Sequence, residues 1–411
     1  MKDYLSHRIE PINTKTDIIA IGNKARESKK KYPQTINGSI GVFLNDDKSL
    51  GKIDLIIKSL KDNLPNNLSY PPFRGQNEYK DEILKWLLKS EYENFKKEYF
   101  IPFSATLGGT GALFFAFNLF LNENQTVILP SIMWSNYKVI ALRSKVKFDY
   151  YELFDKEGKF NFASLEKKIQ QYSSTNSNLL ILINEPCQNP TGYCFSDEEY
   201  DKLYSLLNKE GKKTNLTCLF DIAYIDYQVI DKEVHPLFTY FKKATNFLPA
   251  YAFSCSKSFG VYGLRLGALF TFTKDKEFAS NLEIGMASLA RGIYSCPNGG
   301  GLMSVAKCLS DESQKDILIK QIYANSYTLR QRGLKLVEEL EKNNIKHLPY
   351  SQGFFLSFEV KDALSFCEKL EEQKIFLVPL NEHIVRIALS CLDEKEIVIL
   401  AKKLKEALEN E

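Results

Sequence analysis

The 411-residue sequence has few histidines, and its cysteines are not spaced as metal ligands. The four histidines lie far apart, and none of the eight cysteines belongs to a C-x-x-C pair. These spacings do not indicate a metal site or a histidine-based catalytic triad, although residues distant in sequence can converge in a fold. The cysteines are scattered through apolar stretches, which is typical of reduced, mostly buried thiols in a cytoplasmic protein.

The sequence also lacks a dominant charge and a long apolar run. Its net charge is +3, from 54 basic and 51 acidic residues, so no overall basic field points to a nucleic-acid partner. The longest apolar run, 112–121, contains Asn118 and is too short to span a bilayer. The first ten residues, MKDYLSHRIE, have no apolar signal-peptide core. We expect a cytoplasmic protein that binds neither nucleic acid nor membrane.

Arginine is scarce as well, with nine arginines against 45 lysines. In a chain this rich in lysine, each arginine is a candidate anion-binding residue, because a guanidinium binds carboxylates and phosphates through two parallel hydrogen bonds. Arg265, Arg291 and Arg386 lie in glycine-rich or apolar surroundings. Each could also pair locally as an ordinary structural residue.

The middle of the chain alternates short β-rich runs with helical patterns. We predict strands at 126–129, 179–183, 217–220, 250–253 and 267–272. Amphipathic helices lie between several of them, for example at 197–208, where Ser196 and Glu199 can form a capping box. This alternation predicts an α/β fold with a largely parallel sheet covered by helices.

The pattern changes after about residue 315. A long helix is predicted at 321–343, followed by strands at 353–360 and 384–389 and by helices at 363–373 and 394–408. We therefore predict an N-terminal segment, 1–50, that joins a small α+β domain at 315–411. A large domain is predicted at 51–314.

Polar and aromatic residues follow the predicted strands of the large domain. Trp134 comes after the strand at 126–129 and Asn189 after the one at 179–183, while Asp221 and Lys257 follow the next two. Ligands of open α/β sheets bind at the carboxyl ends of the strands. The sequence thus predicts a site for an aromatic, charged ligand at this edge.

A glycine-rich segment, Gly108-Gly-Thr-Gly, opens the helix predicted at 112–121. Its amides suit a phosphate, because the helix dipole favours negative charge there. The segment is neither a P-loop nor a dinucleotide fingerprint, since no Gly-Lys follows and Phe114 stands where a third glycine is needed. A plain helix-entry turn would look similar.

Lys257 and Asp221 carry the strongest chemical signals. Lys257 follows an apolar strand between Ser254, Ser256 and Gly260, a setting in which an amine can be desolvated and become nucleophilic. Ser254 and Arg265 could then complete a phosphate cup with the amides of Gly109 and Thr110. A carboxylate such as Asp221 can keep a pyridine nitrogen protonated, although it could equally cap a turn.

These segments together resemble one family, the fold-type I, pyridoxal-phosphate-dependent aminotransferases of class I. The segments that match in order and spacing are Asn189-Pro-Thr-Gly192, Asp221-x-x-Tyr224, and Ser254-x-Ser-Lys257-x-x-Gly260 with Arg265. The joint pattern covers most of the chain. The resemblance implies a large cofactor domain with a mostly parallel, seven-stranded sheet and a smaller α+β domain.

Further segments resemble the aspartate/aromatic aminotransferase subgroup. They are Asn37-Gly-Ser-Ile-Gly41-Val-Phe43, Tyr70 nine residues before Tyr79, Gly108-Gly-Thr-Gly-Ala-Leu113, Ile132-Met-Trp134-Ser-Asn136, Arg291-Gly-Ile-Tyr-Ser-Cys-Pro297, and Arg386 in Ile-Val-Arg-Ile-Ala. The sequence departs from the subgroup at Ile132, Tyr137, Asn184, Gln188 and Cys296, and at Gly108, which removes a hydroxyl. These departures bear on the substrate range.

The resemblance implies a role for each matching residue. Lys257 would form a Schiff base with pyridoxal 5′-phosphate and move protons, with Asp221 and Tyr224 as catalytic partners. The other cofactor contacts implied are Gly109, Thr110, Trp134, Asn189, Ser254, Arg265 and Tyr70. The substrate contacts implied are Gly41, Trp134, Asn189, Arg386 for the α-carboxylate, and Arg291 for a side-chain carboxylate.

The resemblance therefore implies a ping-pong transfer of an amino group from an L-amino acid to a keto acid such as 2-oxoglutarate. Tyr70 and Arg291 would serve the neighbouring active site, which implies a homodimer. Three alternatives stay open. The enzyme could prefer aromatic amino acids, it could be a lyase or cyclase on the same fold, or the chain could be a regulator or binding protein without catalysis.

Overall fold

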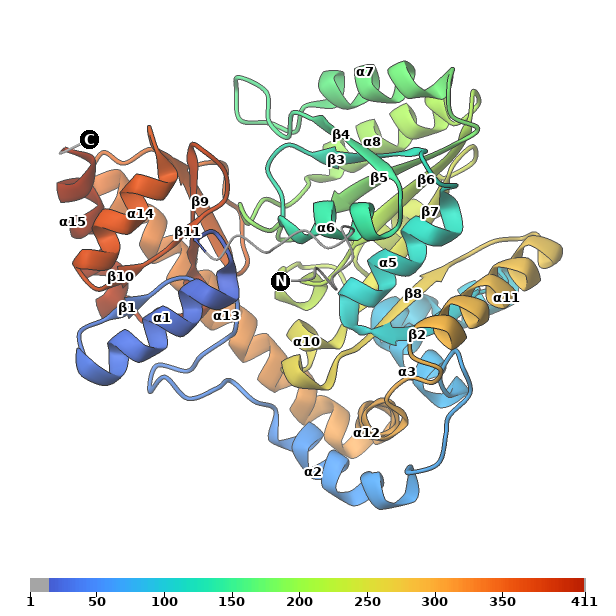
Figure 1. The fold of residues 1–411 in the computed structure, drawn as a ribbon. Helices are drawn as coiled ribbons and strands as arrows, with labels where there is room; N and C mark the ends of the chain where they lie inside the picture. The colour runs from blue at the N-terminus through green and yellow to red at the C-terminus, as the bar shows by residue number, and fades with distance from the viewer. Residues whose placement is uncertain (1–14, 410–411) are drawn as a thin grey trace, which may run out of the picture. The chain divides into compact units, whose positions relative to one another are not determined.

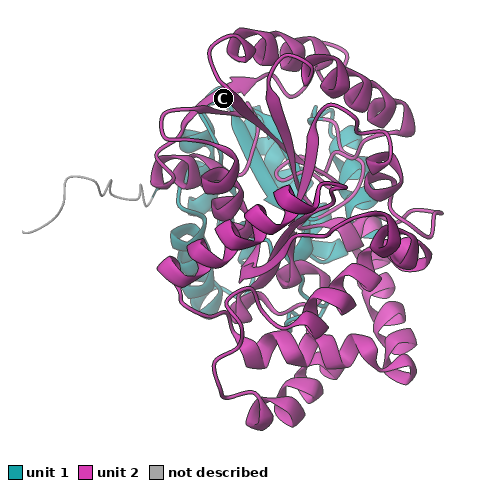
Figure 2. Cartoon of the chain, turned by 90° about the vertical axis from the view of Figure 1, so that its right-hand side faces the viewer, with its two compact units in different colours: residues 1–50, 331–348, 354–411 teal, residues 51–330, 349–353 magenta. Residues whose placement is uncertain are grey.

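The computed structural model describes residues 15–409, so the N-terminal residues examined for a signal peptide lie outside the described range. The chain forms two compact units, shown in different colours in Figure 2. The larger unit comprises residues 51–330 and 349–353, and the smaller comprises 1–50, 331–348 and 354–411. The units divide within one unbroken helix, α13 (Glu312–Lys342), whereas the sequence pattern changes near residue 315.

The larger unit is built on a seven-stranded sheet (Figure 1) with the order β2-β8-β7-β6-β5-β3-β4. Strands β7, β6, β5, β3 and β4 are parallel neighbours, and β8 is antiparallel to both β7 and β2. Their bounds are β2 (Phe103–Leu107), β3 (Thr126–Pro130), β4 (Lys147–Tyr151), β5 (Asn178–Asn184), β6 (Asn215–Asp221), β7 (Leu248–Ser254) and β8 (Leu266–Thr271). The predicted α/β class and the mostly parallel sheet are confirmed.

Both faces of this sheet are buried, which explains why its strands read as continuous apolar runs. Along β5, Leu179 and Ile181 belong to one core cluster, while Leu180 and Leu182 belong to a second. Alternate side chains of a strand point to opposite faces, so the two clusters are the two sides of the sheet. Helices cover both sides.

The second cluster packs against the sheet with side chains from three helices: α5 (Gly108–Phe120), α6 (Asn136–Arg143) and α11 (Lys276–Ile293). The remaining helices of this unit are α2 (Asp54–Asn63), α3 (Asn77–Leu88), α4 (Tyr92–Glu98), α7 (Phe162–Ser173), α8 (Asp197–Glu210), α9 (Pro236–Phe241), α10 (Cys255–Ser258), α12 (Gly299–Ser310) and the first part of α13. The capping box predicted at Ser196 and Glu199 opens α8 and is confirmed. No helix in the described part of the chain combines the length and apolar character that a bilayer crossing requires.

The smaller unit holds a three-stranded antiparallel sheet in the order β11 (Val378–Pro379), β12 (Ile384–Ala388), β9 (Phe355–Glu359). A two-residue parallel pair joins β1 (Ile36–Asn37) to β10 (Ile375–Phe376), so the N-terminal segment belongs to this unit. Its other helices are α1 (Ile18–Lys31), α14 (Ala363–Glu372) and α15 (Glu394–Leu408). The last of these has the predicted bounds.

Candidate active site

The carboxyl ends of β3, β5, β6 and β7 lie at one edge of the sheet, because these strands run parallel. The register pairs Asn184 with Asp221 and Asp221 with Ala252, two residues before Ser254. The residues that follow each strand are thereby gathered at the edge where ligands of α/β sheets bind.

Lys257 lies in the single-turn helix α10, directly after β7. Its Nζ atom is 4.7 Å from the centre of the Tyr262 ring and 5.8 Å from that of the Tyr224 ring. The Ser254 side chain caps the turn by accepting from the Ser256 amide at 3.3 Å. The half-buried amine is therefore held beside two aromatic rings. Tyr262 carried no sequence signal beyond its place in a glycine-containing segment after the lysine.

The glycine-rich segment forms the first turn of α5, next to Ser254 and Arg265. Gly108 has φ +66°, and a β-carbon there would lie 2.6 Å from Arg265 Nη2. A β-carbon at Gly109 would lie 3.3 Å from Ser254 Cβ. The first-turn amides of a helix have no partner within the helix. They form a cradle for an anion here together with the serine hydroxyl and the guanidinium. Gly108, which the sequence marks as the start of this segment and as a lost hydroxyl, also makes room for the arginine.

The Arg265 guanidinium is held by its own loop. Nη1 donates to the carbonyl oxygen of Tyr262 at 2.9 Å and to the Ser256 hydroxyl at 3.3 Å. The residue itself has left-handed backbone angles, with φ 56°. Such a conformation is uncommon for a side-chain-bearing residue and is characteristic of functional sites and tight turns.

Asp221 ends β6 and is buried, with 5% of its surface exposed. The Tyr137 hydroxyl donates to Oδ2 at 2.6 Å, and the Ala223 amide donates to Oδ1 at 3.2 Å. Burial raises the pKa of this carboxyl to about 6, while the bonds from Tyr137 and Ala223 lower it. With a pKa of about 6, the carboxyl is mostly ionised at neutral pH.

The loop after β5 connects Asn189 to Asp221 and Tyr224. Asn184 accepts from the Asn189 amide at 2.7 Å and donates to the main-chain oxygen of Asp221 at 2.8 Å. The Asn189 side chain lies 3.4 Å from the Tyr224 hydroxyl. Asn184, one of the departures from the subgroup, thus connects the ends of the neighbouring strands β5 and β6 through its side-chain amide.

Gln188, another departure, ties the same loop to the segment of Trp134. Its Nε2 donates to the main-chain oxygen of Ile132 at 2.8 Å, and its Oε1 accepts from the Thr191 amide at 3.0 Å. The half-buried Trp134 indole stands perpendicular to the Tyr137 ring, with centroids 5.5 Å apart. Trp134, Tyr137 and Asp221 are therefore neighbours.

Glu185 lies in this region and was missed in the sequence. It is fully buried, and its Oε1 accepts from the Phe195 amide at 2.9 Å and from the Tyr200 hydroxyl at 3.0 Å. Burial raises its pKa to about 8. The available signal was its place two residues after the apolar run 179–183, where a carboxylate is costly.

Tyr70 and Arg291 lie on the surface of the larger unit. Tyr70 is 91% exposed, and the Arg291 guanidinium is 5.7 Å from the centre of the half-exposed Phe73 ring. A hollow of about 400 Å³ is lined by Tyr70, Pro71, Pro72, Phe73, Ser295 and Cys296. The structure thereby brings the segments of Tyr70 and Arg291 together.

Gly41 and Arg386 belong to the smaller unit and meet on Phe355. The buried Arg386 guanidinium lies 4.3 Å from the centre of that ring and donates from Nη2 to the main-chain oxygen of Ser39 at 2.8 Å. A β-carbon at Gly41 would lie 2.5 Å from Phe355 Cζ. Glycine at this position lets the segment pass over the ring.

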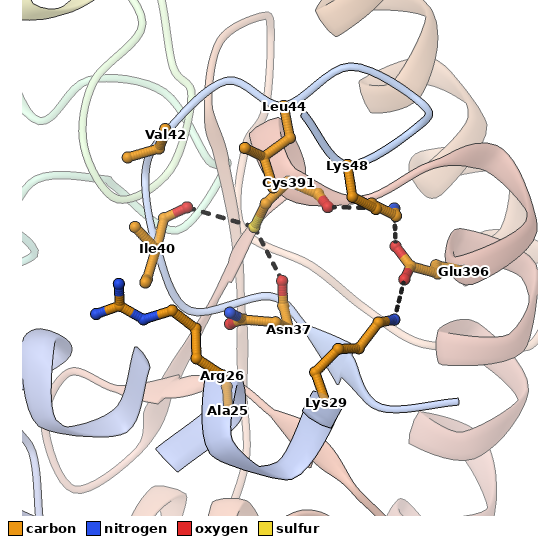
Figure 3. A pocket seen from close by; sticks show the side chains of 10 residues that line it. All are labelled: Ala25, Arg26, Lys29, Asn37, Ile40, Val42, Leu44, Lys48, Cys391 and Glu396. Atoms are coloured by element: carbon orange, nitrogen blue, oxygen red, sulfur yellow. Dashed lines mark hydrogen bonds and ion pairs between the residues drawn. The ribbon is translucent and has the colours of Figure 1, made fainter. Parts of the chain in front are cut away.

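The segment that carries Gly41 also lines a cavity of about 410 Å³ in the smaller unit (Figure 3). The Cys391 thiol lies 2.9 Å from the main-chain oxygen of Asn37 and 3.3 Å from that of Ile40. Lys29 and Lys48 both pair with Glu396 at the rim. The contacts of Cys391 with Asn37 and Ile40 therefore hold the segment that carries Gly41.

Comparisons with known proteins agree on one family. The chain matches "Aminotransferase class I and II" over residues 33–404. It is 27% identical over 271 residues to aspartate aminotransferase of Haemophilus influenzae, and this match spans 65% of either chain. An aminotransferase structure from Anaerococcus prevotii has a TM-score of 0.92 at 26% identity, covering 99% of this chain and all of that one. An aromatic-amino-acid aminotransferase from Burkholderia pseudomallei, covalently bound to pyridoxal phosphate, has a TM-score of 0.80 at 21% identity, covering 99% of this chain and all of that one.

Proposed function

Because the chain belongs to the class I and II aminotransferases, we propose that it transfers an amino group from an L-amino acid to 2-oxoglutarate, as an enzyme of aspartate/aromatic type. The observation that carries the proposal is the position of Lys257. Its helix follows β7 and is capped by Ser254, which also lines the anion cradle at the start of α5. Asp221 ends the adjacent strand β6. An amine, an anion cradle and a buried carboxylate are the three groups that pyridoxal 5′-phosphate needs.

The residues present fit this cofactor. The first-turn amides at Gly109 and Thr110, the Ser254 hydroxyl and the Arg265 guanidinium suit its phosphate. Asp221 suits the ring nitrogen, since its pKa of about 6 leaves it mostly ionised at pH 7. Trp134 would stack on the ring, and Asn189 and Tyr224 would contact the ring oxygen. Bound pyridoxal 5′-phosphate supplies an electron sink for negative charge at the substrate α-carbon.

The chain's own residues carry the remaining steps. The Lys257 amine would take the proton from the substrate α-carbon as general base and, as general acid, deliver it to the cofactor carbon that bears the aldehyde. Asp221 keeps the ring nitrogen charged through this step. We assign Arg386, whose guanidinium is buried on β12, to the substrate α-carboxylate, and Gly41 to contact with the substrate. The same residues serve both half-reactions, so ping-pong kinetics follow.

A homodimer is part of this proposal. Apolar side chains are exposed on the larger unit, among them Leu64, Leu68, Tyr70, Phe73, Ile284 and Ile293. Such surface commonly marks a protein interface. Tyr70 is one of these residues, and the Arg291 guanidinium lies 5.7 Å from the Phe73 ring. We assign Tyr70 to the phosphate and Arg291 to the substrate side-chain carboxylate of the neighbouring active site. The eight free thiols support a reducing, cytoplasmic location.

A panel of amino acids tested with 2-oxoglutarate examines the proposal. Formation of glutamate together with the keto acid of the donor is the expected result, and the Lys257→Ala variant should form neither. A lyase or cyclase would change the amino acid without passing its nitrogen to the acceptor. Comparison of aspartate with tyrosine and phenylalanine decides between the two donor classes, and the altered Cys296 in the hollow beside Arg291 favours including aromatic donors.

A further inference from the structure

Tyr137 and Asp221 form a buried pair that connects α6 to the end of β6. The tyrosine is fully buried and the carboxyl is 5% exposed. The hydroxyl donates to Oδ2 at 2.6 Å, the length of a hydrogen bond from a hydroxyl to a charged carboxylate. In the sequence, Tyr137 stands out only as a departure that bears on substrate range.

The rest of Asp221 is fixed from other directions. Oδ1 accepts from the Ala223 amide at 3.2 Å, and the main-chain oxygen accepts from the Asn184 side chain at 2.8 Å. Tyr137 is therefore the side chain that holds Oδ2. The same ring packs edge to face against Trp134, with an interplanar angle of 85°. One residue thus contacts both side chains that the proposed function places against the cofactor ring.

We propose that Tyr137 is a positioning residue that orients the Asp221 carboxylate toward the ring nitrogen of pyridoxal 5′-phosphate and keeps that carboxylate charged. This inference rests on the proposed function for the identity of the ring. It adds a residue that acts through Asp221. The expected consequence is that the hydroxyl determines the pH below which the cofactor is lost.

The direction of that consequence follows from the charges. Burial raises the pKa of Asp221, and the bond from Tyr137 is the largest of the effects that lower it. Burial and the neighbouring carboxylate raise the pKa of the Tyr137 hydroxyl well above its usual value, so it stays a donor. The titratable groups that face Tyr137 besides Asp221 are Tyr224 and Tyr151, and both also raise its pKa. Without the hydroxyl, the Asp221 pKa rises further and the carboxyl takes up a proton at a higher pH.

The test measures pyridoxal 5′-phosphate affinity of the full-length protein by equilibrium dialysis between pH 5 and 9. Tyr137→Phe removes the donor and leaves the ring. We expect the pH at which affinity begins to fall to move up by about one unit or more, so that affinity near pH 6 drops at least about fivefold further than affinity at pH 8. Asp221→Asn should abolish this dependence, and Tyr137→Phe in the Asp221→Asn background should add no shift.

Tyr151→Phe is the matched control. Tyr151 is also fully buried on the sheet, and burial likewise raises its pKa, but Asp221 takes no hydrogen bond from it. Its variant should keep the wild-type pH dependence. Should Tyr137→Phe not fold, Tyr137→Met removes the same donor with a side chain that adapts to irregular core space. An equal loss of affinity at every pH in either Tyr137 variant would mean that the residue only supports packing, and the inference would be wrong.

A second readout separates this inference from the proposed function. Urea unfolding of the cofactor-free chain, followed against pH, reports the Asp221 titration without any ring. The pH range over which stability declines should extend higher in Tyr137→Phe than in wild type. If the protein bound no pyridoxal 5′-phosphate, the proposed function would fail while this shift would still show that Tyr137 holds the carboxylate charged. A wild-type pH range in the variant would overturn the role of Tyr137 alone.

Discussion

The guanidinium of Arg265 lies directly against Gly108. A β-carbon at Gly108 would be 2.6 Å from Arg265 Nη2 and 3.0 Å from Cζ, on a backbone whose φ is +66°. Two features therefore require glycine at this position: the positive φ of the backbone and the close approach of the guanidinium. The sequence already predicts that Arg265 joins the amides of Gly109 and Thr110 in one phosphate cup, and the structure adds its contact with Gly108.

Gly108→Ala should weaken cofactor binding by displacing Arg265. We expect a loss of pyridoxal 5′-phosphate affinity of about tenfold or more, which corresponds to about 1.4 kcal/mol. Gly263→Ala is a suitable control, because a β-carbon there meets nothing within 4 Å. Equilibrium dialysis of both variants gives the comparison, and equal affinities would show that the cradle does not bind the phosphate.

Asp221→Asn should remove a pH dependence of stability from the cofactor-free protein. The folded-state pKa of about 6 lies above the usual value, so the folded chain holds its proton more tightly than the unfolded chain. Stability from this group is thus complete below about pH 4 and declines by about 3 kcal/mol up to about pH 6. Urea unfolding at pH 4, 5, 6 and 7 should show this decline in wild type and a smaller one in the variant. Parallel curves would contradict the assignment.

Activity of Asp221→Asn supplies a separate check. The variant should transaminate orders of magnitude more slowly in single-turnover experiments, because an uncharged ring nitrogen accepts electrons poorly. A near-normal rate would indicate that Asp221 is only a turn residue.

Glu185→Gln should stabilise the protein at alkaline pH. The pKa of Glu185 is raised to about 8, so its contribution to stability is present at low pH and declines by about 1.4 kcal/mol per unit as pH rises toward 8. A glutamine oxygen can still accept from the Phe195 amide and the Tyr200 hydroxyl. Urea unfolding at pH 6 and 8 should therefore show a smaller loss in the variant than in wild type. Equal losses would mean that Glu185 does not titrate in this range.

Arg291→Ala should lower kcat/KM for aspartate by roughly two to four decades, since loss of the partner of a desolvated carboxylate costs about 3–5 kcal/mol. Aromatic donors should be affected much less, because their side chains carry no carboxylate. Arg386→Lys is the contrasting variant, because it keeps the charge but loses the forked guanidinium. It should lower the affinity for every amino-acid substrate alike. Steady-state kinetics with aspartate and phenylalanine test both. If Arg291→Ala affected the two donors equally, Arg291 would be structural.

Much of the large unit could be predicted because its strands are buried on both faces. Continuous apolar runs such as 179–183 marked the strands, and the residues after them marked the site edge. Strand β4 was missed because Lys147–Tyr151 is only partly buried and reads as a mixed polar segment. Side-chain contacts between residues that are distant in the sequence could not be predicted. Nothing in the sequence pairs Tyr137 with Asp221, 84 positions apart, or Gly41 with Phe355.

The central claim, that Lys257 is the residue to which pyridoxal 5′-phosphate is bound, is tested most directly by borohydride reduction of the purified protein followed by peptide mapping. The purified protein should be yellow and should lose its colour on reduction, with the label on Lys257 and none on the other lysines. Label on a different lysine, or a protein that takes up no cofactor, would contradict it.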